Sequence, residues 1–177
     1  MSVLFHTPGV RILCVDPGLR GCGVAVFDGG FLINAAYVEN PVTHGRGYKA
    51  HSEMGNAVSR WLAKDVDRVI IEHPRIYTGS GKPKSIDEND LLDVVAVGAA
   101  VASWCNYRET ETVFPSEWKG QVPKEVMTER IRRSLSDIER HNIQKCKASL
   151  MHNVLDACGI GLFRLGRLNR KVIHNGD

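Results

Sequence analysis

The chain has 177 residues and a net charge of +3, and its 43% hydrophobic content is typical of a single soluble globular domain, here spanning residues 1–177. The longest apolar stretch, residues 94–104, is too short to cross a membrane, and residues 1–8 lack a signal-peptide pattern, so we expect a cytoplasmic protein. Five cysteines without a CxxC pair argue against a zinc or disulfide framework.

The first part of the chain predicts a three-strand meander, a helix and a fourth strand. Three short apolar runs separated by glycine-rich turns predict antiparallel strands at residues 11–16, 22–27 and 31–38. Residues 48–64 fit an amphipathic helix. Residues 68–72 predict a buried strand that ends shortly before Pro74.

The second part alternates helices with one more strand. Residues 75–87 are rich in Gly, Ser, Lys and Pro and predict a loop. We expect a helix crowded with small residues at 88–106, a short strand at 112–114, and helices at 124–135 and 147–165. The order βββ-α-β-α-β-α-α predicts a mixed α/β sheet with helices on both faces.

Three carboxylates occupy comparable places in this scheme. Asp16 ends the first strand, Glu72 ends the fourth, and Asp156 lies in the last helix. If the first and fourth strands are parallel neighbours, Asp16 and Glu72 emerge side by side, and the last helix can bring Asp156 against them. Such an oxygen-rich cluster suits two Mg²⁺ or Mn²⁺ ions, which can clamp the attacking and leaving oxygens of a phosphodiester.

Each acid also has a simpler interpretation. Asp16 precedes Pro17-Gly18 and alone could be a turn former, and Asp156 could be a solvated helix position. Glu72 is harder to explain this way, because a carboxylate at the end of a buried strand is costly without a partner, a proton or a metal. Taken together, the three acids favour a shared site.

The charge is unevenly distributed along the chain. Residues 1–114 carry 11 basic and 13 acidic residues, whereas residues 115–177 carry 12 and 7, so the last third has a net charge of +5. A basic segment of this kind favours a polyanionic partner such as nucleic acid, although a solvated basic helix would read the same way.

Three motifs in this order resemble the RuvC-type Holliday junction resolvases of the RNase H-like superfamily. They are ILCVDPGLRGCG at 12–23, VIIE at 69–72 and HNVLDA at 152–157. Sugar kinases and actin-like ATPases share the Asp-Gly turn, but they need two domains and a longer chain. The segment 115–120 looks more like phage or other divergent members than cellular resolvases.

The resemblance implies a five-stranded mixed sheet, with three antiparallel strands and then parallel additions, and helices on both faces. It implies Mg²⁺-dependent cutting of four-way DNA junctions by a homodimer, leaving 5′-phosphate and 3′-hydroxyl ends. The family's acids map to Asp16, Glu72 and Asp156. A further metal-site position, usually Asp or His, holds Asn153, which offers a carbonyl oxygen but no charge.

Basic and aromatic residues are assigned by the same resemblance. Lysines at the places of Lys119 and Lys124 lie near the scissile phosphate in the family, although both could be ordinary surface lysines. The helix at 88–106 corresponds to the family's dimer helix, or it simply packs on the sheet. The expected DNA-binding residues are Arg75, Tyr77, Lys82 and Lys84 in the loop, where Tyr77 would stack on a base or pack under the loop, and Arg130, Arg132 and Arg133.

Other functions stay open at this point. The same fold could serve an RNase H-like nuclease that acts on other branched DNA or on an RNA–DNA hybrid. Asn153 also leaves room for a DNA-junction-binding protein without catalytic activity. A nucleotide-dependent kinase is the most distant alternative.

Overall fold

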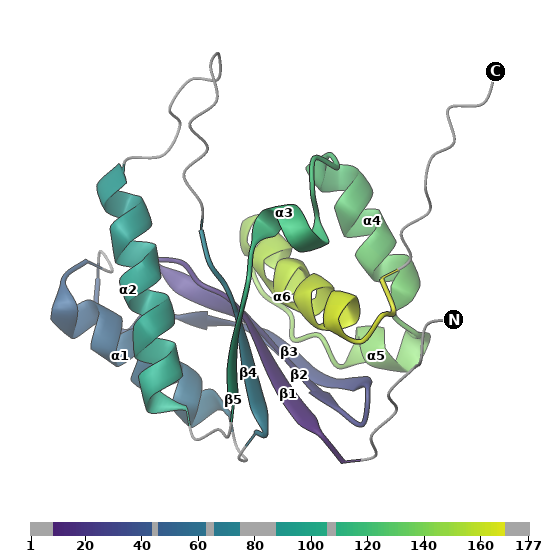
Figure 1. The fold of residues 1–177 in the computed structure, drawn as a ribbon, viewed down its shortest axis with the longest axis horizontal. Helices are drawn as coiled ribbons and strands as arrows, with labels where there is room; N and C mark the ends of the chain where they lie inside the picture. Colours follow the sequence, from purple (N-terminus) through teal and green to yellow (C-terminus); the bar gives the residue numbers. More distant parts are fainter. Residues whose placement is uncertain (1–8, 44–45, 63–65, 75–87, 106–108, 169–177) are drawn as a thin grey trace.

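The computed structural model describes residues 9–43, 46–62, 66–74, 88–105 and 109–168, and the structural statements below concern those ranges. Five strands form one sheet (Figure 1): β1 (Arg11–Asp16), β2 (Gly21–Asp28), β3 (Phe31–Glu39), β4 (Arg68–Glu72) and β5 (Glu109–Val113). Their order is β3-β2-β1-β4-β5, so β1 is central. Strands β1, β2 and β3 pair antiparallel, and β4 pairs parallel with β1 and β5, which confirms the mixed sheet.

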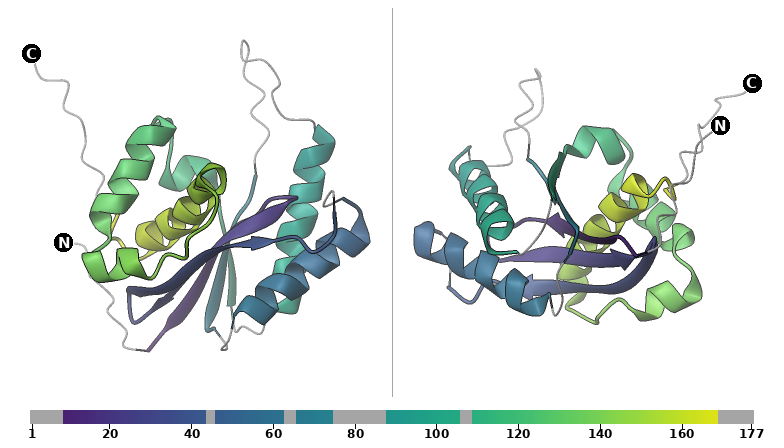
Figure 2. Two further views of the ribbon diagram at one scale, coloured as in Figure 1. Left: turned by 180° about the vertical axis from the view of Figure 1, so that it is seen from behind. Right: turned by 60° about the horizontal axis from the view of Figure 1, so that its bottom comes forward.

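Helices cover both faces of this sheet (Figures 1 and 2). On one face lie α1 (Tyr48–Trp61) and α2 (Glu88–Trp104). The other face carries α3 (Pro115–Trp118), α4 (Lys124–Ser134), α5 (Asp137–His141), the 3₁₀ helix η1 (Ala148–Leu150) and α6 (Met151–Arg164). Within the described ranges, no helix is long and apolar enough to cross a membrane.

Strand β1 shows why this arrangement needs a continuous apolar run. Ile12 and Cys14 belong to the core cluster beneath α4 and α6. Leu13 and Val15 belong to the second cluster, beneath α1 and α2. Because helices cover both faces, successive side chains of β1 all enter a core, and the strand shows no polar alternation.

The structure corrects three details of the predicted elements. Strand β5 begins at Glu109 rather than at residue 112, because its sequence ETETV is polar at an edge of the sheet and gave no apolar signal. Helices α3 and α5 were not predicted, since four and five residues are too few for a periodic pattern. The last helix, α6, begins at Met151 rather than at residue 147, and the 3₁₀ helix η1 precedes it.

Candidate active site

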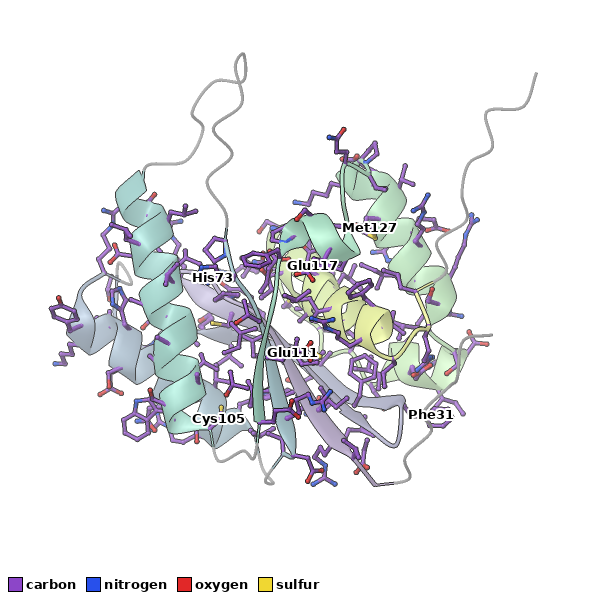
Figure 3. All side chains as sticks on the ribbon, viewed as in Figure 1. Phe31, His73, Cys105, Glu111, Glu117 and Met127 are labelled. Atoms are coloured by element: carbon purple, nitrogen blue, oxygen red, sulfur yellow. The ribbon has the colours of Figure 1, made fainter. Side chains whose placement is uncertain are left out.

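Asp16 and Glu72 lie side by side at the carboxyl ends of β1 and β4, because these strands meet the expected condition of being parallel neighbours. β1 and β4 pair in parallel with Val15 opposite Ile71, so the next residue of each strand is an acid. Burial raises the pKa of Asp16 well above its usual range, and the negative charge of Glu72 raises it further. In Figure 3, the labelled His73 directly follows β4, and the labelled Glu117 lies on α3, which follows β5.

Helix α6 reaches these acids because β2 carries a glycine at the closest point. Gly23 pairs directly with Asp16 across the β1–β2 ladder. A Cβ on Gly23 would lie 1.9 Å from the backbone oxygen of Asn153, so a larger residue would push α6 away from the sheet. The close approach places Asn153, and Asp156 one turn later, beside the end of β1.

Trp118 at the end of α3 and the next residue, Lys119, contact the acids directly. The indole Nε1 of Trp118 donates a hydrogen bond of 2.6 Å to Oε2 of Glu72. The ammonium of Lys119 lies 3.4 Å from Glu72 Oε2 and 3.2 Å from Asp156 Oδ2. Trp118 fits beside α6 because Gly159 has no side chain; a Cβ there would lie 2.5 Å from the indole ring.

The three carboxylates of the site carry more negative charge than the nearby lysines balance. The charge of Asp156 also raises the pKa of Asp16, and Lys119 and Lys124 only partly oppose this effect. Burial raises the pKa of Glu72 despite Lys119 and the Trp118 hydrogen bond. Burial alone lowers the pKa of Lys119, but the carboxylates of Glu72, Asp156 and Asp16 raise it overall. The site contains three acids, and one lysine makes ion pairs with two of them.

The donor set fits a hard divalent cation. Carboxylate oxygens are the ligands that Mg²⁺ and Mn²⁺ prefer, and Asn153 can add a carbonyl oxygen. As the side chains stand, no three His, Cys, Asp or Glu residues in the described part of the chain are grouped as metal ligands. The ammonium of Lys119 instead bridges Glu72 and Asp156. The predicted ligand set of Asp16, Glu72, Asp156 and Asn153 therefore stays a prediction.

The other predicted residues fall into two groups. Lys124 is exposed at the first position of α4, and its charge lowers the pKa of Asp16, which places it near the acids. Arg132 and Arg133 are exposed on α4, whereas Arg130 is partly buried. Arg133 also pairs with Glu129 on the same helix. The four predicted loop residues lie outside the described residues: Arg75, Tyr77, Lys82 and Lys84.

Sequence reasoning missed Trp118 and Gly23. A tryptophan after a short strand carries no local signal that its N–H will meet a carboxylate 46 positions earlier. Gly23 lies within the first motif, but the motif alone does not show which element packs against it. A buried Trp beside a Lys, close after a strand, could have raised the question of a buried acceptor.

No protein-family model and no curated protein matches this sequence. Among solved structures, T. thermophilus RuvC in complex with a Holliday junction substrate matches with a TM-score of 0.56 at 15% identity, over 89% of this chain and 97% of that chain. The yeast mitochondrial Holliday junction resolvase Ydc2 matches with a TM-score of 0.52 at 12% identity, over 92% of this chain and 83% of that chain. The chain therefore has the fold of the RuvC-type resolvases, as its motifs predict.

Proposed function

We propose that this protein is a metal-dependent endonuclease that cuts four-way or otherwise branched DNA, leaving 5′-phosphate and 3′-hydroxyl ends. The proposal rests on one observation. Asp16, Glu72 and Asp156 come together from β1, β4 and α6 at one site, where nearby lysines do not balance their negative charge. Two structural neighbours support this substrate class: T. thermophilus RuvC was solved with a Holliday junction substrate, and yeast Ydc2 is named a Holliday junction resolvase.

Each residue of the site has its own role in the proposed reaction. Asp16, Glu72 and Asp156 would hold the divalent cations, and Asp16 lies close enough to the other two acids for their charges to raise its pKa. Asn153 would assist through its carbonyl oxygen. When bound, Mg²⁺ or Mn²⁺ would supply the positive charge that stabilises the attacking and leaving oxygens. Lys119 would neutralise the charge of the scissile phosphate in the transition state.

The exposed basic residues of α4 supply a surface for the DNA backbone. Arg132, Arg133 and Lys124 are exposed on the helix that begins beside the acids. Contacts of this kind release counterions, so we expect junction affinity to fall steeply as salt rises. The predicted contacts from Arg75, Tyr77, Lys82 and Lys84 belong to the same proposal.

Helix α2 supports the proposed homodimer. Its residues 94–102 are all apolar or glycine, and Leu92 is 68% exposed although α2 packs on α1. Trp104, 47% exposed, donates a hydrogen bond to Ser52 of α1 and so belongs mainly to the packing within one subunit. Analytical ultracentrifugation tests the dimer, because Leu92→Glu should shift the protein toward monomer while Ser103→Glu, exposed near the end of α2, serves as a control.

Asp16→Asn tests the nuclease activity. Binding to a four-way junction should survive, because the substitution changes one atom, while cutting in Mg²⁺ should disappear. Asp137→Asn, which removes the same charge from an exposed position on α5, should cut normally. Full cutting by Asp16→Asn would contradict the proposal.

Two experimental outcomes would change the proposed function. Asn153, which replaces a charged residue at the metal-site position, favours a junction-binding protein without catalytic activity as the second candidate. Tight junction binding with no cutting by the unaltered protein in Mg²⁺ or Mn²⁺ would support that candidate. Cutting of a fork or an RNA–DNA hybrid in preference to a four-way junction would keep the chemistry and change the substrate.

A further inference from the structure

Lys119 holds an unusual position for a lysine meant to contact DNA. Its ammonium lies between two of the three acids, 3.2 Å from Asp156 and 3.4 Å from Glu72. These carboxylates are the same groups that would hold a divalent ion. An ammonium and a metal ion cannot both occupy the space between the same oxygens, so the position of Lys119 conflicts with metal binding.

Trp118 contacts the same cluster in a way that does not conflict. Its N–H is fixed on Oε2 of Glu72, and the indole is 2% exposed, packed against α6 at Gly159. Among the described residues, Oε1 of Glu72 accepts only a long hydrogen bond from Lys119, at 3.5 Å. Trp118 therefore holds Glu72 in place, while the contacts of Lys119 with Glu72, at 3.4 and 3.5 Å, are longer and weaker.

Lys119 also has a route out of the cluster. Its side chain is 28% exposed, unlike Trp118, and Lys119 is the C-cap residue of α3, followed by Gly120 at a φ of 58°. Four rotatable bonds allow the ammonium to swing toward solvent without moving the backbone. A phosphate of bound DNA would offer the ammonium a new anionic partner.

We propose that Lys119 is a displaceable counter-cation, which occupies the acid cluster in the free protein and yields it to a divalent ion when a DNA phosphate draws the ammonium away. This inference rests on the proposed function for its DNA partner. Two consequences follow. The free protein binds metal more weakly than its acids alone would, and metal binding and junction binding strengthen each other by the same factor.

Calcium titrations of the free protein test the first consequence. Isothermal titration calorimetry should show Ca²⁺ binding on the order of tenfold tighter to Lys119→Met than to the unaltered protein, because the competing charge is gone. Lys119→Arg, which keeps the charge, should bind much as the unaltered protein does. Lys145→Met removes an exposed lysine for which no contact with the acids is present, and it should leave Ca²⁺ affinity unchanged.

Lys119→Met also leaves acids without their counter-charge, so its stability must be followed. We expect a lower melting temperature without metal and a larger rise on adding Ca²⁺ than the unaltered protein shows, since binding to the folded state stabilises it. An equal or smaller rise, together with unchanged or weaker Ca²⁺ affinity, would overturn the proposal.

The second consequence needs the junction but no cutting. In the unaltered protein, Ca²⁺ affinity should rise on the order of tenfold when a four-way junction is added, and in Lys119→Met this rise should largely vanish. A gel of the titrated sample confirms that the junction is intact. Equal coupling in both proteins would overturn the displacement by DNA.

These outcomes are separable from the proposed function. If no branched DNA is cut but Lys119→Met still binds Ca²⁺ more tightly, the nuclease activity fails and the counter-cation stands. If junctions are cut normally but Ca²⁺ affinity is indifferent to Lys119, the nuclease activity stands and the counter-cation fails.

Discussion

Two buried glutamates, Glu72 and Glu139, are held in opposite ways. Glu139 is 2% exposed, and both its oxygens accept from Arg167, at 2.6 and 2.8 Å, while the backbone N–H of Leu32 and both donors of Ser136 add further hydrogen bonds. Burial alone would raise the pKa of Glu139, but these hydrogen bonds lower it to about 2. Glu72 has one strong donor, Trp118, and its pKa is raised.

This difference distinguishes Glu139, whose carboxylate has a structural role, from Glu72, whose carboxylate we propose binds a cation. Glu139 ties α5 to β3 and to the segment after α6, and its charge is fully balanced by Arg167. Glu72 lies beside two more acids and shares one lysine with Asp156. An unsatisfied demand for positive charge inside a folded protein is costly, so the proposed divalent cation would stabilise the site around Glu72.

Replacing Glu72 should have the largest effect on activity. Glu72→Gln keeps the shape and an acceptor for Trp118 but removes a negative charge from the proposed metal ligands, so cutting should fall about a thousandfold. Because one charge leaves an over-acidic cluster, the free energy of unfolding without metal should stay the same or rise. Junction-cutting rates and urea denaturation measure the two quantities, and a large loss of stability would erase the contrast with Glu139.

Replacing Glu139 should have the reverse profile. Glu139→Gln leaves the Arg167 guanidinium without its charge partner, and removing one member of a buried pair typically costs about 3 kcal/mol of unfolding free energy. The cutting rate per folded molecule should be unchanged, since Glu139 makes no contact with the acids near β1. Denaturation measures the unfolding free energy, and single-turnover assays measure the cutting rate of the folded fraction. A selective loss of cutting would contradict the prediction.

Acidification should weaken the Glu139 contact. The folded-state pKa of about 2 lies below the ordinary value of 4.5, so the stabilisation is complete above about pH 5 and disappears as the pH falls toward 2. Allowing for solvent screening, about 2 kcal/mol should be lost over this range. Urea denaturation at several pH values checks this, because the stability gap between the unaltered protein and Glu139→Gln should narrow by this amount in acid.

Trp118→Phe should have the smallest of these effects and the opposite sign from Lys119→Met. Phenylalanine fills most of the space beside Gly159 but cannot donate to Glu72. Groups that orient metal ligands typically contribute tenfold or more in affinity, so Ca²⁺ binding should weaken about tenfold. Calorimetry measures this, with melting temperature as the check on folding; tighter binding would mean that the N–H restrains Glu72 away from the metal.

Much of the site was predictable from local patterns. Asp16 and Glu72 each end an apolar run, and β1 and β4 pair in parallel, which was the condition for a shared site. The motif spacing also led to the fold that the solved resolvases share. What the patterns omitted were short or polar elements, such as α5, whose only local signal was the capping box of Ser136 and Glu139.

The sequence by itself determined which acids stand at strand ends and that the sheet is mixed, because hydrophobic periodicity and strand-end position are local properties. The tertiary structure alone decided how each acid is balanced. Glu72 meets Trp118 across 46 positions, and Glu139 meets Leu32 across 107. Such contacts depend on how closely the elements pack, as at Gly23, and on the direction of each side chain after packing, which no local pattern encodes.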